Sequence, residues 1–273
     1  MQATYHIVRV FNKAEDSLGN QAVIFLNDNA LLKNEQSRIS VDITKNVNVN
    51  TTCFISQIDT SNYEVQCFNG ENTIQCCGHG MIAAAKTVFS ITEQTNITIN
   101  KNISASKIID DFSEDLVALK LPRVKSRQQN VPAWTKDIIF IGEKSLSPDY
   151  SAISENEEGY LLLEFNPAIP LEQFRNMHLD LKLVCEKTNR AIVIIQWDKK
   201  TNNLYMRYFA PQYGVQEDIA TGSVMRFVAD YIEQNHRIKH FAVNQLSAAG
   251  GFMKIDCHPE TIKITANAYI ETC

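Results

Sequence analysis

One stretch of the sequence places reactive residue types directly before an apolar run. It reads QCCGHGMIAAAKTVF, at residues 75–89, and contains Cys76, Cys77 and His79. A cysteine near a helix N-terminus is favoured as the thiolate and can act as a base or a nucleophile. A histidine can give or take a proton near neutral pH. We read Cys76 as a structural thiol and take Cys77 and His79 as candidate catalytic residues.

A second stretch, EDIATGS at residues 217–223, repeats the arrangement with carboxylates. Glu217 and Asp218 stand before another apolar run. Asp218 can orient the imidazole of His79 or move a proton itself, so it is the third candidate catalytic residue. A negative helix start that only complements the helix dipole is the plainer alternative for this pair.

Both apolar runs predict helices that begin at glycines, over residues 78–89 and 222–234. Each is apolar on nearly all sides, which requires burial all round. A helix N-terminus has free N–H groups and a partial positive charge, so it attracts a carboxylate or phosphate. We expect Thr221 to N-cap the second helix, while Gly222 and Ser223 let a ligand approach the backbone.

The remaining chain is dominated by short runs rich in Val, Ile, Phe and Tyr, which predict strands. They cover Tyr5–Phe11, Gln21–Leu26, Thr52–Ile58, Glu64–Phe68, Ile97–Asn100, Leu116–Leu121, Asp137–Ile141, Tyr160–Glu164, Ala191–Trp197, Leu204–Phe209, Phe252–Cys257 and Thr261–Thr265. Amphipathic patterns at 31–42 and 171–184 predict further helices. We therefore expect an α+β protein with a curved, mostly antiparallel sheet around each buried helix.

The same order of predicted elements occurs twice along the chain: helix, strand, strand ending in Phe, loop and buried helix. Phe68 corresponds to Phe209, and Gly78 corresponds to Gly222. This repeat predicts two similar lobes. The N-terminal lobe covers residues 1–122, with completion by a C-terminal strand at 261–273 left open, and the other lobe covers 131–260. The polar residues 123–130 are the expected linker, and a cleft at the lobe interface is the expected site.

Composition excludes several classes of function. The net charge is −5 and the pI is about 5.7, which argues against a nucleic-acid partner. No apolar run reaches membrane-spanning length and no signal-peptide core is visible, so a cytoplasmic location is the expectation. The 7 cysteines include no C-x-x-C pair, so neither a disulfide framework nor a metal site is expected.

Four motifs, in order, resemble the PhzF-like family, named for phenazine biosynthesis, within the diaminopimelate-epimerase fold. SLGNQAVIFL resembles the family's early Gly-Asn-Pro-Ala-Val-Val strand entry, and CGHGMIAAAKTVF resembles its Cys-Gly-His-Ala helix start. RYFAP and EDIATGS match its Phe-Ala-Pro and Glu-Asp-x-x-Thr-Gly-Ser elements. The last motif is the most specific of the four. The resemblance covers nearly the whole chain.

The resemblance implies two lobes, each a barrel-like sheet around a central helix, and action without a cofactor, often as a homodimer. The founding reaction is a proton shift that isomerises an unsaturated cyclic amino acid precursor. His79, Asp218 and Ser223 match the family's polar active-site residues. The residues expected to bind substrate are Asn20, Thr51, Gly78, Gly80, Thr221 and Gly222.

One position departs from the family pattern. Thr51, in NVNTTCF, stands where the family has the glutamate that shuttles the proton. A threonine hydroxyl is not a useful base near pH 7, so proton transfer would fall to Cys77, His79 or Asp218. The related epimerases use two cysteines, but here Thr221 precedes Gly222 in the second copy, which disfavours a two-thiol racemase.

We therefore expect a cofactor-independent isomerase that shifts a proton on a small carboxylate- or amino-acid-like metabolite in a biosynthetic pathway. Two alternatives remain open. One is a hydrolase or lyase on the same scaffold, in which Asp218 and His79 activate water or break a bond. The other is a ligand-binding relative that lost activity together with the glutamate.

Overall fold

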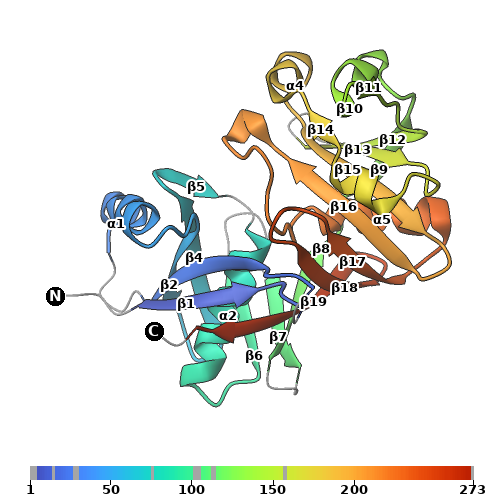
Figure 1. Ribbon diagram of the computed structural model, residues 1–273. Helices are drawn as coiled ribbons and strands as arrows, with labels where there is room; N and C mark the ends of the chain where they lie inside the picture. Colours follow the sequence, from blue (N-terminus) through green and yellow to red (C-terminus); the bar gives the residue numbers. More distant parts are fainter. Residues whose placement is uncertain are drawn as a thin grey trace. The chain divides into compact units, whose positions relative to one another are not determined.

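The computed structural model shown in Figure 1 is a mixed α and β protein, mostly sheet with few helices. It describes residues 5–13, 16–26, 31–74, 77–100, 106–111, 115–155 and 159–271. The chain forms two compact units, one of Met1–Pro122 with Glu260–Cys273 and the other of Arg123–Pro259. Among the described residues, no helix has the length and apolar character needed to cross a membrane.

The first unit is built on a sheet whose pairing order closes on itself. The strands, in sheet order, are β1 (Tyr5–Val10), β2 (Asn20–Leu26), β3 (Thr52–Gln57), β4 (Asn62–Asn69), β6 (Asn96–Asn100), β7 (Ser106–Asp111), β8 (Leu116–Pro122) and β19 (Thr261–Ile270). Strand β19, from the far end of the chain, pairs with β8 and also with β1, which joins the two ends of the series. The short β5 (Asn72–Ile74) pairs with β4.

Helix α2 (Gly78–Ile91) is almost completely buried, as its apolar sequence requires. It contacts β1, β2, β3, β4, β7, β8 and β19. Ile82 and the three alanines that follow it are fully buried. Three consecutive small side chains keep the helix narrow, so strands can pack closely on more than one face. Helix α1 (Lys33–Asn46) is amphipathic instead and contacts β3 and β4.

The second unit has an open series of strands. Their order is β9 (Ser126–Gln129), β12 (Tyr150–Ser154), β13 (Tyr160–Phe165), β15 (Ala191–Asp198), β16 (Asn203–Phe209), β17 (His240–Gln245) and β18 (Gly251–Cys257). Helix α5 (Met225–His236) contacts β9 and β18. A small sheet of β11 (Lys144–Ser145), β10 (Ile139–Ile141) and β14 (His178–Leu179) lies in the same unit. So do the single turns η1 (Ala133–Asp137) and η2 (Pro211–Tyr213).

The two units share one series of strand pairings. In the first, β2 and β3 are parallel, β3 and β4 antiparallel, β4 and β6 parallel, and β6 and β7 antiparallel. In the second, β13, β15, β16, β17 and β18 follow the same alternation. A helical segment crosses over between the first parallel pair in each unit: α1 in one, and α3 (Leu171–Arg175) with α4 (Leu181–Lys187) in the other.

Two segments differ from their predicted structure. The single helix predicted at 171–184 is divided into α3 and α4 by β14. There Leu179 is buried and pairs with Ile139, and Asp180 accepts a hydrogen bond from the backbone N–H of Leu183 and so starts a new helix. The residues predicted to be a linker, 123–130, contain strand β9, which pairs with β12.

The isoleucines of α2 allow a matched test of this burial. Ile82 is fully buried and Ile91 is 52% exposed. Ile82→Ala leaves a cavity and should lower the free energy of unfolding by about 2–5 kcal/mol, whereas a surface change such as Ile91→Ala should cost about 0.5 kcal/mol or less. Denaturant unfolding of both variants measures the difference. Equal losses would contradict the packing of α2 described above.

Candidate functional site

The first candidate group lies at the start of α2, where Cys77 is the residue that precedes the helix. The backbone N–H of Met81 donates to the Cys77 carbonyl at 3.0 Å, which closes the first turn. The side chains of Cys77 and His79 are both buried. The Cys77 sulfur lies 3.7 Å from Nδ1 and 4.0 Å from Nε2 of the His79 ring. The structure thus brings together two of the predicted catalytic residues.

Two further cysteines, which sequence reasoning did not single out, complete this group. Cys53 on β3 and Cys67 on β4 are cross-strand partners, and their sulfurs lie 2.9 Å apart. A Cβ atom on Gly80 would lie 2.7 Å from the Cys53 sulfur, 2.8 Å from that of Cys77 and 3.1 Å from that of Cys67. The absent side chain of Gly80 therefore makes room for three thiols. Packing of sulfur is one role of this glycine in the structure, and its contact with substrate stays a prediction.

The thiols around Gly80 have unequal acidity. Hydrogen bonds from Cys53 and then Cys67, together with the nearby His79 imidazole, hold the pKa of the Cys77 thiol well below its usual range despite burial. Burial, followed by the neighbouring thiols, raises the pKa of Cys53. The pKa values of Cys77 and Cys53 are therefore displaced in opposite directions, and Cys77 is the more acidic of these two thiols. A thiolate at the start of a helix also agrees with the direction of the helix dipole.

The second candidate group is the loop before α5. The hydroxyl of Thr221 donates to the Asp218 carboxylate at 2.6 Å, and the backbone N–H of Asp218 donates to the Tyr208 carbonyl at 3.0 Å. Asp218 and Thr221 are thus brought together, as a hydrogen-bonded acid and hydroxyl. Two more of the residues predicted for the site are therefore in direct contact.

Gln245, on β17, clamps this loop from both directions. Its side chain is buried. Its carbonyl oxygen accepts from the backbone N–H of Thr221 at 2.8 Å, and its amide nitrogen donates to the backbone carbonyl of Asp218 at 2.6 Å. Ser247 adds a hydrogen bond to the carbonyl of Ile219 at 2.6 Å. These contacts fix the backbone on both sides of the Asp218 carboxylate. Sequence reasoning missed Gln245 because it follows Asp218 by 27 residues and belongs to no motif.

Glu217 has a structural partner. Arg207 on β16 makes a two-pronged ion pair with it, with Nε 2.6 Å and Nη2 2.8 Å from the carboxylate oxygens. The Arg207 guanidinium also lies 4.9 Å from the centre of the Phe209 ring. The carboxylate of Glu217 is therefore held by Arg207, whereas that of Asp218 accepts from Thr221. Such bidentate pairs fix geometry as well as charge.

The prediction that Thr221 caps the second helix is wrong. Helix α5 begins at Met225, its N-cap position is Val224, and no side chain caps it. The backbone N–H of Met225 donates to Gly222 and that of Phe227 to Val224, so a tight turn precedes the helix proper. Ser223 lies in this turn, half-buried. Thr221 is free to bond Asp218 because the helix starts later than its sequence suggested.

The other predicted binding residues lie at the starts of elements. Gly78 is the first residue of α2. Asn20 begins β2, after Gly19, whose φ of +71° and close approach to the Val10 carbonyl exclude a side chain there. Thr51 directly precedes β3 and is buried, and its carbonyl accepts from the backbone N–H of Val23 at 2.9 Å. Cys76 lies outside the described residues. Within the described ranges, no cluster of His, Cys, Asp and Glu is suited to a metal ion.

The lowered pKa of Cys77 predicts a measurable thiolate. An ordinary cysteine has a pKa of about 8.5 and is mostly protonated near pH 7. The folded protein should show the ultraviolet absorbance of a thiolate near pH 7, and this band should fade only as the pH falls through the lowered pKa. Cys77→Ser should abolish the band, while Cys185→Ser, at an exposed cysteine, should leave it unchanged. A band that survives Cys77→Ser would contradict the assignment.

Gln245 predicts a second measurable effect. Gln245→Leu leaves the buried N–H of Thr221 and the part-buried carbonyl of Asp218 without their partner, at a cost of about 1–3 kcal/mol for the buried group and less for the other. Thermal unfolding should show this loss, and Gln57→Leu, at an exposed glutamine, serves as the control. Equal stability of the two variants would mean that the loop before α5 holds its shape without the clamp.

The chain is similar over most of its length to known proteins. It is 25% identical over 214 residues to an uncharacterised isomerase of Vibrio cholerae, covering 78% of this chain and 71% of the relative. A crystal structure of a phenazine biosynthesis PhzF-family protein from Enterococcus faecalis has a TM-score of 0.83 at 17% identity, over 100% of this chain and 98% of that one.

A more distant likeness is a hydroxyproline epimerase from Agrobacterium vitis, solved with bound trans-4-hydroxy-L-proline. Its TM-score is 0.58 at 8% identity, over 98% of this chain and 90% of that one. These structures share the fold of the present chain. The family model of the PhzC-PhzF phenazine biosynthesis-like proteins matches residues 8–269, and the chain therefore belongs to this family.

Proposed function

We propose that this protein is a cofactor-independent isomerase that moves a proton on a small carboxylate- or amino-acid-like metabolite of a biosynthetic pathway. The observation that carries the proposal is the buried contact between the Cys77 sulfur and the His79 ring at the start of α2. The family membership, the isomerase name of the Vibrio cholerae relative and the epimerase activity of the Agrobacterium vitis protein support it. A homodimer remains a prediction from the family resemblance, and a cytoplasmic location remains a prediction from the sequence.

In this proposal Cys77 is the base. The lowered pKa of the Cys77 thiol favours its basic thiolate form, and His79 is close enough to take the proton onward or to return one to the substrate. Thr51 cannot replace a glutamate in this role, because a hydroxyl does not ionise near pH 7. We assign Thr51 to substrate binding, with Asn20.

Asp218 is the second acid–base group of the proposal. Its carboxylate accepts a hydrogen bond from Thr221, and its backbone is held by Gln245, so its geometry is fixed before substrate arrives. Ser223, in the turn before α5, is assigned to hydrogen bonding with the substrate. The substrate carboxylate is assigned to the first N–H groups of α2, at Gly78, where the helix dipole favours a negative charge.

A solvent-deuterium experiment tests the proposal. Purified protein in deuterated water is incubated with unsaturated and chiral amino acids, and products are followed by mass spectrometry and NMR. An isomerase gives a product of unchanged formula that has gained deuterium at carbon. Cys77→Ser and Asp218→Asn should each lower turnover by about 10²–10⁴-fold, as expected for removal of an acid–base group. Asp137→Asn, at an exposed carboxylate, should not.

Three results would contradict this proposal. A product that differs from the substrate by water or by a lost fragment would replace isomerisation with hydrolysis or elimination. Turnover of Asp218→Asn near that of the wild type would remove Asp218 from the reaction. Binding without turnover across the whole panel would leave a ligand-binding protein.

A further inference from the structure

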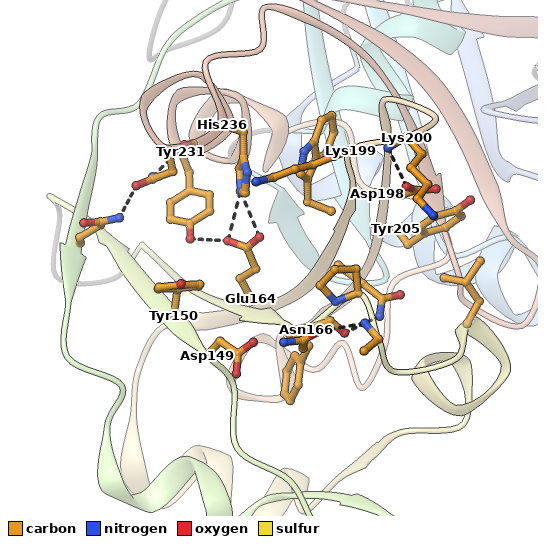
Figure 2. A pocket seen from close by; sticks show the side chains of 18 residues that line it. Asp149, Tyr150, Glu164, Asn166, Asp198, Lys199, Lys200, Tyr205, Tyr231 and His236 are labelled. Atoms are coloured by element: carbon orange, nitrogen blue, oxygen red, sulfur yellow. Dashed lines mark hydrogen bonds and ion pairs between the residues drawn. The ribbon is translucent and has the colours of Figure 1, made fainter.

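A cavity of about 910 Å³ opens in the second unit, beside the C-terminal half of α5 (Figure 2). Its walls come from the ends of β13 and β15, the start of β12 and the last turn of α5. Strands β13 and β15 are parallel, and both end at this cavity. The carboxyl ends of neighbouring parallel strands are a favoured place for small ligands. The volume is within the range of small-molecule sites.

This cavity is separate from the group around Asp218. The turn that contains Ser223 precedes the first residue of α5, whereas the cavity is lined by Tyr231 and His236 from the last turns of the same helix. Helix α5 has 12 residues, which at about 1.5 Å per residue separates its two ends by about 18 Å. A ligand here would leave the proposed reaction site unoccupied.

The floor of the cavity is a buried, hydrogen-bonded carboxylate. The Glu164 side chain accepts from the Tyr231 hydroxyl at 2.6 Å, and its other oxygen lies 3.0 Å from Nε2 of His236 (Figure 2). Burial, followed by the charge of Glu164, raises the pKa of Tyr231 well above its usual range, so the hydroxyl stays protonated and keeps donating. The Trp197 ring lies 5.6 Å from the His236 ring. These contacts give the floor a fixed shape.

The walls carry opposite charges on opposite sides. Lys199 and Lys200 follow the end of β15, and Asp149 precedes β12. Figure 2 shows Lys199 reaching toward His236 and Lys200 beside Asp198, while Asp149 and Tyr150 lie across the cavity from them. Among the described residues, these two ammonium groups and the Asp149 carboxylate form no ion pair. The nearby Asp198 carboxylate accepts from Thr201 at 2.7 Å and from the Lys200 backbone N–H at 2.9 Å, and these hydrogen bonds, with a smaller contribution from the charge of Lys200, lower its pKa.

Charges of opposite sign that face one cavity select a ligand that carries both. Tyr150 is 59% exposed, so its ring is available beside Asp149 and can support an ammonium group through a cation–π contact. A simple anion would be attracted by the two lysines and repelled by Asp149. A simple amine would be attracted by Asp149 and repelled by the lysines. A dipolar molecule meets attraction at both ends.

We propose that this cavity is a binding site for a small peptide- or amino-acid-like zwitterion, with the carboxylate toward Lys199 and Lys200 and the ammonium group toward Asp149 and Tyr150. The site is independent of the proposed reaction. Its lining residues all come from one compact unit, so it needs no residue of the other.

The two tryptophans provide a site-specific measurement. Trp197 lines the cavity and Trp134 does not. The indole N–H signal of each is assigned in the NMR spectrum from Trp→Phe variants. The full-length protein is titrated with L-tyrosine, glycyl-L-tyrosine and glycylglycyl-L-tyrosine, and with the N-acetyl and C-terminal amide forms of each. At least one free zwitterion should shift the Trp197 signal in a saturable way and leave Trp134 unchanged, and its blocked forms should bind at least tenfold more weakly.

Charge variants then locate the two ends of the ligand. The double variant Lys199→Ala with Lys200→Ala, and the single variant Asp149→Asn, should each weaken binding at least tenfold. Lys136→Ala with Lys144→Ala, at exposed lysines of the same unit, is the matched control and should bind as the wild type does. All four lysines are exposed, so thermal unfolding should be unchanged and the comparison should not be confused by misfolding.

Three outcomes would overturn the proposal. One is the absence of a saturable Trp197 shift with every free zwitterion. The second is equal binding of an N-acetyl form, which would make this an anion site without an ammonium wall. The third is wild-type affinity in both cavity variants, which would place the bound probe elsewhere. Loss of turnover in Asp218→Asn with retained Trp197 shifts would separate this site from the proposed reaction.

Discussion

The space left by the absent side chain of Gly80 determines how the first unit is built around α2. The sulfurs of Cys53, Cys67 and Cys77 crowd the position that a Cβ atom would occupy, so a larger residue would require these thiols or the helix to shift. Such overpacking of a core is destabilising. The same contact puts two thiol donors against Cys77, and these donors set its acidity. One packing constraint therefore fixes both the position of the helix start and its chemistry.

Much of this arrangement was readable from local sequence. The unbroken apolar character of residues 78–89 predicted a buried helix, and α2 begins at the glycine where the pattern begins. The four ordered motifs predicted the family, which the family model confirms. The alternation of Val, Ile and aromatic residues predicted most strands. These signals are local because helix burial and strand alternation depend on the spacing of neighbouring residues.

Sequence reasoning missed the residues that are brought together only by the pairing of strands. Cys53 and Cys67 meet only because β3 and β4 pair with these two residues directly opposite each other. Gln245 reaches Thr221 only because β17 lies beside β16 in the sheet. Neither contact produces a periodic pattern in a single sequence, so neither could be predicted from it. The predicted cap at Thr221 failed because residues 222–224 form a turn before α5, and the Thr221 hydroxyl donates to Asp218 instead.

The two units support their helices in different ways, although their strands pair in the same series. Helix α2 is surrounded by apolar side chains and thiols, whereas α5 carries the buried Asp230. That carboxylate accepts hydrogen bonds from the Arg123 guanidinium at 2.9 Å, the Ser126 backbone N–H at 2.8 Å and the Ser126 hydroxyl at 2.7 Å. A buried charge is tolerated only with such partners. The polar segment that follows β8 is therefore held against α5, which explains why it forms β9 in place of a free linker.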